Sequence, residues 1–214
     1  MSDRRSSVAN GQRVRVGCDR RGAPRTPPVN GAPRPAAPQQ PPAGVDAAAY
    51  KAAFRRHAAG VVVITADAGR GPAGFTATSL ASLSLDPPLV SFGLSSTASS
   101  WPTVAAADTV VVHFLAADQE QLAQRFATSG IDRFAAPTRW SRLATGEPVL
   151  DDVPRYLRAV VDHRLPVGDH HLVVARVVGA VAVRDHLPLV YHGGAYTTLP
   201  AGSAAAGGAE VKPT

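Results

Sequence analysis

Cysteine is almost absent from this 214-residue sequence, and long apolar runs are absent altogether. Cys18 is the only cysteine, so the chain has no disulfide framework, no thiolate metal site and no plausible cysteine nucleophile. No stretch reaches the roughly 18 to 20 apolar residues that a membrane-spanning helix requires. The N-terminal segment also lacks the apolar run of a secretory signal. We therefore expect a cytoplasmic protein that does not enter a membrane.

Excess positive charge is confined to the first 45 residues. They hold eight of the 19 prolines and eight arginines against two aspartates, which leaves 14 basic and 14 acidic residues in 46–214. We expect residues 1–45 to be disordered, because they bury too little apolar surface to offset their ordering entropy. The balanced body is not a basic nucleic-acid-binding domain. A DNA-associated protein that acts through residues 1–45 remains an alternative, with salt-sensitive binding as its signature.

The expected folded domain spans residues 46–199, and residues 200–214 form a flexible tail of small residues. Three short helices are expected within residues 46–199. Asp46 is an N-cap for an alanine-rich helix that ends at Gly60. The pair Ser99-Ser100 precedes a second helix, and Asp118 opens a third with a capping-box pattern.

Strand patterns outnumber these helices. They occupy residues 60–66, 74–79, 80–85, 89–95, 109–115, 156–165, 171–183 and 187–192. Residues 131–155 form a polar, proline-containing excursion. A mainly β body with a few short helices favours a barrel or a sandwich over a βαβ fold.

One glycine pattern imitates a dinucleotide-binding loop. Residues 69–74, "GRGPAG", match G-x-G-x-x-G, with Asp86 downstream. That fingerprint requires its third glycine to open a helix. Gly74 instead opens a segment rich in β-branched and hydroxyl residues, so the pattern indicates a hairpin.

Hydroxyl side chains crowd residues 71–94, "GPAGFTATSLASLSLDPPLVSFGL". The alternation predicts that Leu80, Leu83 and Leu85 point inward while Ser82 and Ser84 face the other way. Converging hydroxyls and backbone N–H groups bind a phosphate without lysine. A solvated strand face is the alternative interpretation.

His170 and His171 are adjacent in "GDHHLVVARVV". Neighbouring strand residues point to opposite faces, so the two rings do not bind one metal ion. One ring is expected to face the barrel interior or a cleft, and the other to face solvent. No third ligand is spaced to complete a zinc site, and we expect no metal. The absence of a Gly-x-Ser-x-Gly elbow argues against hydrolase chemistry.

Seven motifs then follow one another in a recognisable order: "AAGVVVITA", the hydroxyl-rich segment, "SSWPTV", "VVHFLAADQEQLAQRFA", "DRF", "GDHHLVVARVV" and "LVYHGGAY". Together they resemble the flavin reductase family over roughly residues 50–199. The resemblance implies an antiparallel split β-barrel of the Greek-key, FMN-binding type with a few short peripheral helices. It also implies NAD(P)H-dependent reduction of FMN or FAD, a homodimer, and a partner monooxygenase that receives the reduced flavin.

The resemblance also assigns residues to roles. His170 matches a histidine implicated in nicotinamide binding, and we take it as the catalytic candidate. Ser82, Leu83 and Ser84 match the strand beside the isoalloxazine ring. The flavin phosphate and ribityl chain are expected at Thr76, Ala77, Thr78 and Ser79, with a second phosphate-contacting loop at Ser99 and Ser100; His113 completes the cofactor-binding set.

Several positions depart from the family pattern. Ser96 stands where many relatives carry Lys or Arg, and Gly193 and Ala195 replace residues that are often basic. Thr78 and His113 stand where many relatives have asparagine. The sequence leaves open FMN or FAD, NADH or NADPH, and a non-catalytic flavin-binding module, acting as a carrier or sensor, as the alternative to a reductase.

Overall fold

The computed structural model describes residues 44–200. The segment that we expected to be disordered and the expected C-terminal tail lie outside this range, apart from residues 44, 45 and 200. Among residues 44–200, no helix is long and apolar enough to cross a membrane.

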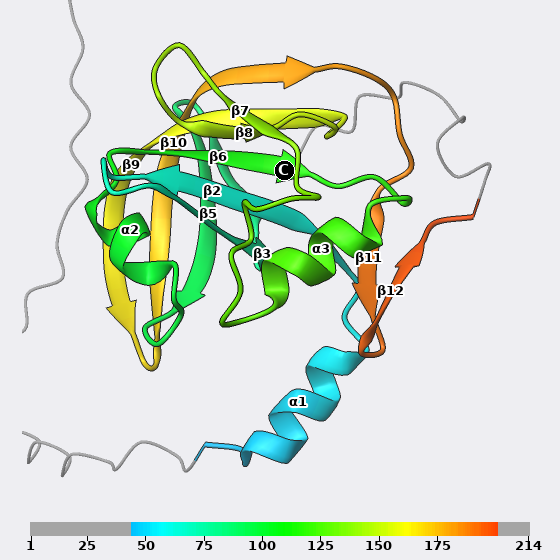
Figure 1. The fold of residues 1–214 in the computed structure, drawn as a ribbon. Coiled ribbons are helices and arrows are strands. Elements are labelled where there is room, and N and C mark those ends of the chain that lie inside the picture. The colour runs from blue at the N-terminus through cyan, green and yellow to red at the C-terminus, as the bar shows by residue number, and fades with distance from the viewer. Residues whose placement is uncertain (1–43, 201–214) are drawn as a thin grey trace, which may run out of the picture. The chain divides into compact units, whose positions relative to one another are not determined.

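A seven-stranded sheet forms the body of the structure, and every strand pair in it is antiparallel. The spatial order is β3 (Pro72–Ala77), β2 (Val62–Asp67), β6 (Thr109–Phe114), β9 (Arg155–Val167), β10 (His170–Ala182), β5 (Pro88–Ser95) and β4 (Ala81–Leu85). The sheet curls on itself (Figure 1). As a result, the rings of Phe75 on the edge strand β3 and Phe92 on β5 lie 6.0 Å apart, measured between centroids. The predicted antiparallel split barrel is confirmed.

Two small sheets accompany the barrel. One comprises β1 (Ala59–Gly60), β11 (Leu189–His192) and β12 (Ala195–Thr198). The other is a hairpin of β7 (Trp140–Arg142) and β8 (Pro148–Leu150). The predicted polar excursion of residues 131–155 contains this hairpin, for which no strand was predicted. Strands of three residues are too short to show an alternating pattern.

The helices are α1 (Ala47–Arg55), α2 (Trp101–Ala106) and α3 (Glu120–Ala127). Asp46 caps α1 as predicted, because its Oδ1 accepts a hydrogen bond of 2.8 Å from the Ala49 N–H. The third helix begins one residue later than an N-cap at Asp118 predicts. Gln119 is its N-cap, and the Gln119 side chain accepts from the Ala116 N–H, which fixes the turn before the helix.

Strand β2 is buried on both faces. Val62 and Ile64 point into the barrel core, whereas Val63 points outward into a second cluster that includes Phe126 of α3. This explains why the strand is a continuous apolar run rather than an alternating one. Helix α3 therefore covers the outer surface of the barrel at β2 and β3 (Figure 1).

Strand β4 corrects one of the sequence predictions. Leu83 and Leu85 are 54% and 88% exposed instead of pointing inward. The register between β4 and β5 shifts between Ser82 and Ser84, and such a bulge breaks the strict alternation on which the prediction relied. As the free edge of the sheet, β4 leaves these leucines on the surface.

The glycine-rich turn after β2 binds a carboxylate of its own chain rather than a nucleotide. The N–H groups of Gly69 and Gly71, both with positive φ, donate to Asp67 Oδ1 at 2.8 and 3.2 Å. Gly74 lies within strand β3, so no helix follows the glycines. The structure thus excludes the dinucleotide-binding interpretation of residues 69–74.

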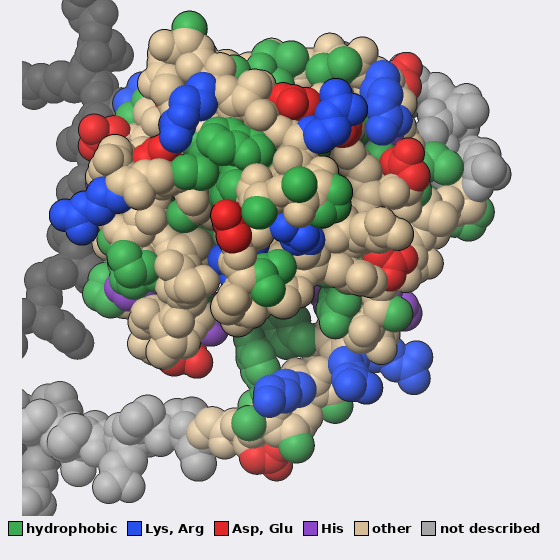
Figure 2. Space-filling view, in the orientation of Figure 1, with side chains coloured by type: hydrophobic (Ala, Val, Ile, Leu, Met, Phe, Trp, Pro, Cys, Tyr) green, Lys and Arg blue, Asp and Glu red, His purple; other side chains and the backbone are tan. Residues whose placement is uncertain are grey.

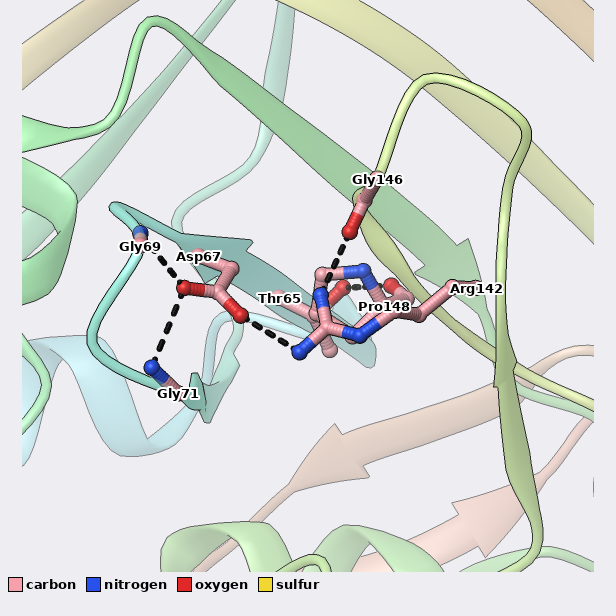
Figure 3. A network of polar contacts seen from close by, with 7 residues as sticks. All are labelled: Thr65, Asp67, Gly69, Gly71, Arg142, Gly146 and Pro148. Atoms are coloured by element: carbon pink, nitrogen blue, oxygen red, sulfur yellow. Dashed lines mark hydrogen bonds and ion pairs between the residues drawn. The ribbon is translucent and has the colours of Figure 1, made fainter.

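The same carboxylate fastens the β7–β8 hairpin to the barrel (Figure 3). Arg142 Nη2 donates to Asp67 Oδ2 at 2.7 Å, and Thr65 Oγ1 donates to the Pro148 carbonyl at 2.6 Å. Burial alone would raise the pKa of Asp67. The hydrogen bonds from Arg142, Gly69 and Gly71 outweigh that effect and hold the pKa below its usual value.

His113 is a core residue and not a cofactor contact, which corrects its predicted role. The ring is completely buried; its Nδ1 lies 3.0 Å from the Val63 carbonyl, and its Nε2 accepts from the Leu150 N–H at 3.1 Å. Both nitrogens are therefore used to join β2, β6 and β8. Desolvation lowers the pKa of His113 to about 4, so the ring is neutral at neutral pH.

This burial makes stability depend on pH. Because the pKa of His113 is lower in the folded state than in the unfolded state, the unfolded chain takes up a proton first as the pH falls through 6.5. We expect the free energy of unfolding to fall by about 3 kcal/mol between pH 6.5 and pH 4 from this group. Urea unfolding at a series of pH values measures the free energy of unfolding of the wild type and of His113→Asn, whose amide also has a donor and an acceptor but does not titrate. If both proteins lose the same free energy of unfolding between pH 6.5 and pH 4, His113 is not the source of the pH dependence.

The contact between β3 and α3 depends on Gly74. A Cβ atom there would lie 2.7 Å from Cε1 of the fully buried Phe126 and 3.1 Å from the Ile64 carbonyl oxygen. Gly74→Ala should lower the free energy of unfolding by about 1–3 kcal/mol through overpacking. Gly60→Ala is the matched control, because a Cβ at Gly60 meets nothing within 4 Å. Equal stability of the two variants would show that α3 moves aside freely.

Candidate functional site

Strand β5 brings three groups of predicted site residues together. Ser82 lies on β4, which pairs with one side of β5. Ser79, in the turn before β4, accepts a hydrogen bond of 3.0 Å from the Gly93 N–H of β5. His170 opens β10 on the other side, directly opposite Ser95. The hydroxyl-rich segment, the loop after β5 and the histidine pair therefore share one region of the surface.

The loop that follows β5 carries closely spaced hydroxyl groups. Ser95 Oγ and Thr97 Oγ1 are 3.1 Å apart, and the Ser96 N–H donates to the Asp169 carbonyl at 3.0 Å. Ser100 is buried and is the N-cap of α2. We call residues 95–100 the hydroxyl loop. Its backbone is held at both ends, by β10 on one side and by α2 on the other.

His171 locks this loop to the barrel. Its ring stacks on Trp101 with centroids 3.7 Å apart and planes 15° apart, and its Nδ1 lies 3.2 Å from Ser96 Oγ. The ring of His170 points elsewhere and is half exposed. The two rings diverge as predicted, although His171 packs against α2 and not in the barrel interior.

His170 is oriented by its neighbour Asp169. Its Nδ1 lies 2.7 Å from Asp169 Oδ1. The hydrogen bond from His170 and the attraction of its charge lower the pKa of Asp169, so the carboxylate is the acceptor and Nδ1 the donor. In the neutral ring, Nε2 then carries a lone pair. That atom is left to contact a ligand.

Arg133 is a site residue that sequence analysis did not single out. Its Nη1 donates to Ser99 Oγ at 3.2 Å and to the Gly74 carbonyl at 3.1 Å, while its Nε donates to the Thr128 carbonyl at 3.0 Å. Its Nη2 makes no hydrogen bond to any residue of 44–200. Burial lowers the pKa of this guanidinium. Arg133, Ser99 and Ser100 line a pocket of about 180 Å³.

The backbone around Arg133 is fixed by a second arginine. Arg125 of α3 donates to the carbonyls of Asp132, Arg133 and Ala135 at 2.9 to 3.2 Å. Arg133 thus enters the pocket from a rigid loop. The only sequence signal for it was the "DRF" motif, which carried the resemblance without a role for the arginine.

The segment Thr76 to Ser79 does not form one group of donors, contrary to expectation. Thr76 Oγ1 donates to the Ala123 carbonyl of α3 at 2.6 Å, and Ala77 is buried in the barrel core. Thr78 is exposed toward α1, and Ser79 is bonded to β5. Of the predicted phosphate contacts, Thr78, Ser79 and Ser99 have hydroxyl groups near open space.

These residues suit a phosphorylated ligand. Hydroxyl groups and a guanidinium are strong hydrogen-bond donors to a phosphate. Strand β4, which carries Ser82 and Ser84, is the free edge of the sheet beside β5. Among residues 44–200, no group of three or more His, Cys, Asp or Glu side chains is arranged to hold a metal ion.

Comparison with known proteins identifies the family of the chain. The model of the flavin reductase like domain matches residues 54–200. The chain is 50% identical over 157 residues to an NADH:FMN oxidoreductase of Rhodococcus qingshengii, covering 72% of this chain and 82% of the relative. It is 29% identical over 155 residues to HsaB, the reductase subunit of a flavin-dependent monooxygenase of Rhodococcus jostii, covering 72% of this chain and 79% of HsaB.

A solved structure gives the same result. The flavin reductase domain protein of Arthrobacter sp. FB24 superposes with a TM-score of 0.68 at 40% identity, over 72% of this chain and 95% of that one. Residues 54–200, which the family model matches, include the barrel, the hydroxyl loop, Arg133 and the histidine pair. This chain belongs to the flavin reductase family and is an oxidoreductase.

Proposed function

We propose that the protein reduces FMN with NADH and releases the reduced flavin to a partner monooxygenase. The observation that carries the proposal is the convergence of the hydroxyl loop, Arg133 and His170 around β5, in a chain that is half identical to an NADH:FMN oxidoreductase. The relationship to HsaB supports a monooxygenase as the partner. FAD is the alternative flavin, and NADPH is the alternative hydride donor.

The phosphate of FMN would be held by the hydroxyl loop and Arg133. Nη2 of Arg133 has no other partner within residues 44–200, and Nη1 already orients Ser99. Arg133 would add a positive charge to the hydroxyl and N–H donors of a loop in which Ser96 is uncharged. The isoalloxazine ring would lie along β4 beside Ser82, Leu83 and Ser84, as the resemblance implies.

The protein's contribution to the reaction is positioning. A bound flavin accepts a hydride from NADH through its own electronic structure. His170 is placed to contact the nicotinamide through Nε2, with Asp169 fixing the ring. No acid–base pair is needed for this transfer, and holding the two rings in contact supplies most of the rate.

A homodimer is proposed from the exposed apolar residues near this region. Leu165 of β9 and Leu172 of β10 face each other across the pair and are 48% and 37% exposed. Leu83 and Leu85 on the free edge strand add to the exposed apolar surface. A second copy would cover surface that a monomer leaves in contact with water. Cytoplasmic location stays a prediction.

Steady-state kinetics test the main proposal. Purified protein should oxidise NADH only when flavin is supplied, with a higher kcat/KM for FMN than for FAD, because the hydroxyl loop and Arg133 recognise a terminal phosphate. The assay crosses FMN and FAD with NADH and NADPH and follows absorbance at the nicotinamide band. Oxidation no faster than in the absence of protein, with all four combinations, would refute a reductase.

Arg133 gives a test of the phosphate site. Arg133→Ala should weaken FMN binding about tenfold or more, because it removes a charge-assisted hydrogen bond. The affinity for riboflavin, which lacks the phosphate, should hardly change. Flavin fluorescence measures both dissociation constants. Arg139→Ala is the control, because it removes an arginine that forms an exposed ion pair with Asp152. Equal losses for FMN and riboflavin would mean that Arg133 only supports the loop.

A further inference from the structure

The pocket beside Arg133 contains a negative charge as well as a positive one. Asp132 lines this pocket of about 180 Å³ together with Arg133, Ser99 and Ser100. Among the lining residues, all of which fall within 44–200, Asp132 is the one carboxylate and Arg133 the one cation. The site in which we place a phosphate thus includes an anion that belongs to the protein.

One oxygen of Asp132 builds the turn that presents Arg133. Asp132 Oδ1 accepts hydrogen bonds from the N–H groups of Phe134 at 2.9 Å and Ala135 at 3.2 Å. Aspartate side chains commonly close a turn in this way, by accepting from the backbone two residues further on. On the apolar side, the Phe134 ring packs edge-to-face on Phe126 with centroids 5.3 Å apart. Arg133 lies between these two anchors.

The other oxygen of Asp132 is not used by the fold. Oδ2 makes no hydrogen bond to any residue of 44–200, and the carboxylate forms no ion pair there. Arg133 directs its guanidinium to Ser99 and to two backbone carbonyls instead. Closing the turn requires only an acceptor oxygen, which the amide of an asparagine also provides. The negative charge of Asp132 is therefore an addition to its structural role.

This charge lies in surroundings of mixed sign. On the face of the molecule that Figure 2 shows, acidic and basic side chains are interspersed over the body. Local charges then decide how strongly an anion is held. A phosphate monoester carries about two negative charges at neutral pH. In this pocket it would be attracted by Arg133 and repelled by Asp132.

We propose that Asp132 weakens the binding of the flavin phosphate and thereby speeds the release of FMN. The inference rests on the proposed function, in which Arg133 and the hydroxyl loop hold that phosphate. Arg133 selects a phosphorylated flavin, and Asp132 limits how tightly it is held. Differences in affinity arise mostly from dissociation rates, so a reductase that passes its product to a separate enzyme benefits from a weakened phosphate site.

Substitution by asparagine separates the charge of Asp132 from its hydrogen bonds. Asp132→Asn keeps an acceptor for the two N–H groups and removes the charge, so the dissociation constant of FMN should fall about fivefold. That of riboflavin, which has no phosphate, should stay constant. Asp132→Ala also removes the acceptor and should bind FMN more weakly than Asp132→Asn does. Asp185→Asn is the matched control, because Asp185 is exposed, forms no ion pair within 44–200 and does not line the pocket.

Stopped-flow fluorescence locates the effect in time. Asp132→Asn should release FMN about fivefold more slowly than the wild type, with little change in the association rate, because the repulsion acts on the bound phosphate. Added salt should reduce the difference between the two proteins. A change confined to the association rate would overturn the proposal, because Asp132 would then act only on the approach of the flavin.

Equilibrium titrations of FMN and riboflavin decide the remaining outcomes. Equal FMN affinity of the wild type and Asp132→Asn would overturn the proposal, and so would an equal gain for FMN and riboflavin, which would indicate a change in the shape of the loop. If Arg133→Ala still weakens FMN binding in those cases, the phosphate site stands without a role for the charge of Asp132. Failure of the wild type to oxidise NADH would refute the reductase, while the titrations would still test Asp132.

Discussion

The antiparallel pairing of β5 with β10 on one side and β4 on the other is the constraint on which the site depends. Val90, Phe92 and Leu94 of β5 are buried in the barrel core, which fixes the register of the strand. With that register set, Ser95 must lie opposite His170, and the loop that follows must reach α2 beside Trp101. The core therefore determines the position of polar groups that make no contribution to it.

Around that strand, the polar groups are held in place before any ligand arrives. The stack of His171 on Trp101 fixes the hydroxyl loop, and the hydrogen bonds of Arg125 fix the loop that carries Arg133. Donors that are already oriented lose little entropy when they bind a phosphate. Asp169 would serve His170 in the same way in the proposed reaction, because its hydrogen bond to Nδ1 holds the ring in one orientation.

Sequence patterns predicted the elements with long periodic runs, and they predicted the family through the order of its motifs. They did poorly where tertiary contacts decide. The bulge in β4 places Leu83 and Leu85 on the surface. His113 lies in the interior, where its two ring nitrogens pair with backbone groups of Val63 and Leu150. The hydroxyl of Thr76 donates to a backbone carbonyl of α3. Arg133 was missed because its partner Ser99 is 34 residues away, a separation that no local pattern reports.

The cation at the proposed phosphate site comes from an unexpected element. Ser96, where the resemblance implies a basic residue, is uncharged here, yet the guanidinium of Arg133 hydrogen-bonds to Ser99 of the same hydroxyl loop. Arg133 would therefore supply the cation from a different element than Ser96, and it would approach a phosphate from another direction. Phosphate recognition tolerates this exchange because it depends on where the donors converge and not on which strand supplies them. A neutral domain with 14 cations and 14 anions thus keeps local positive charge where phosphates are expected to bind.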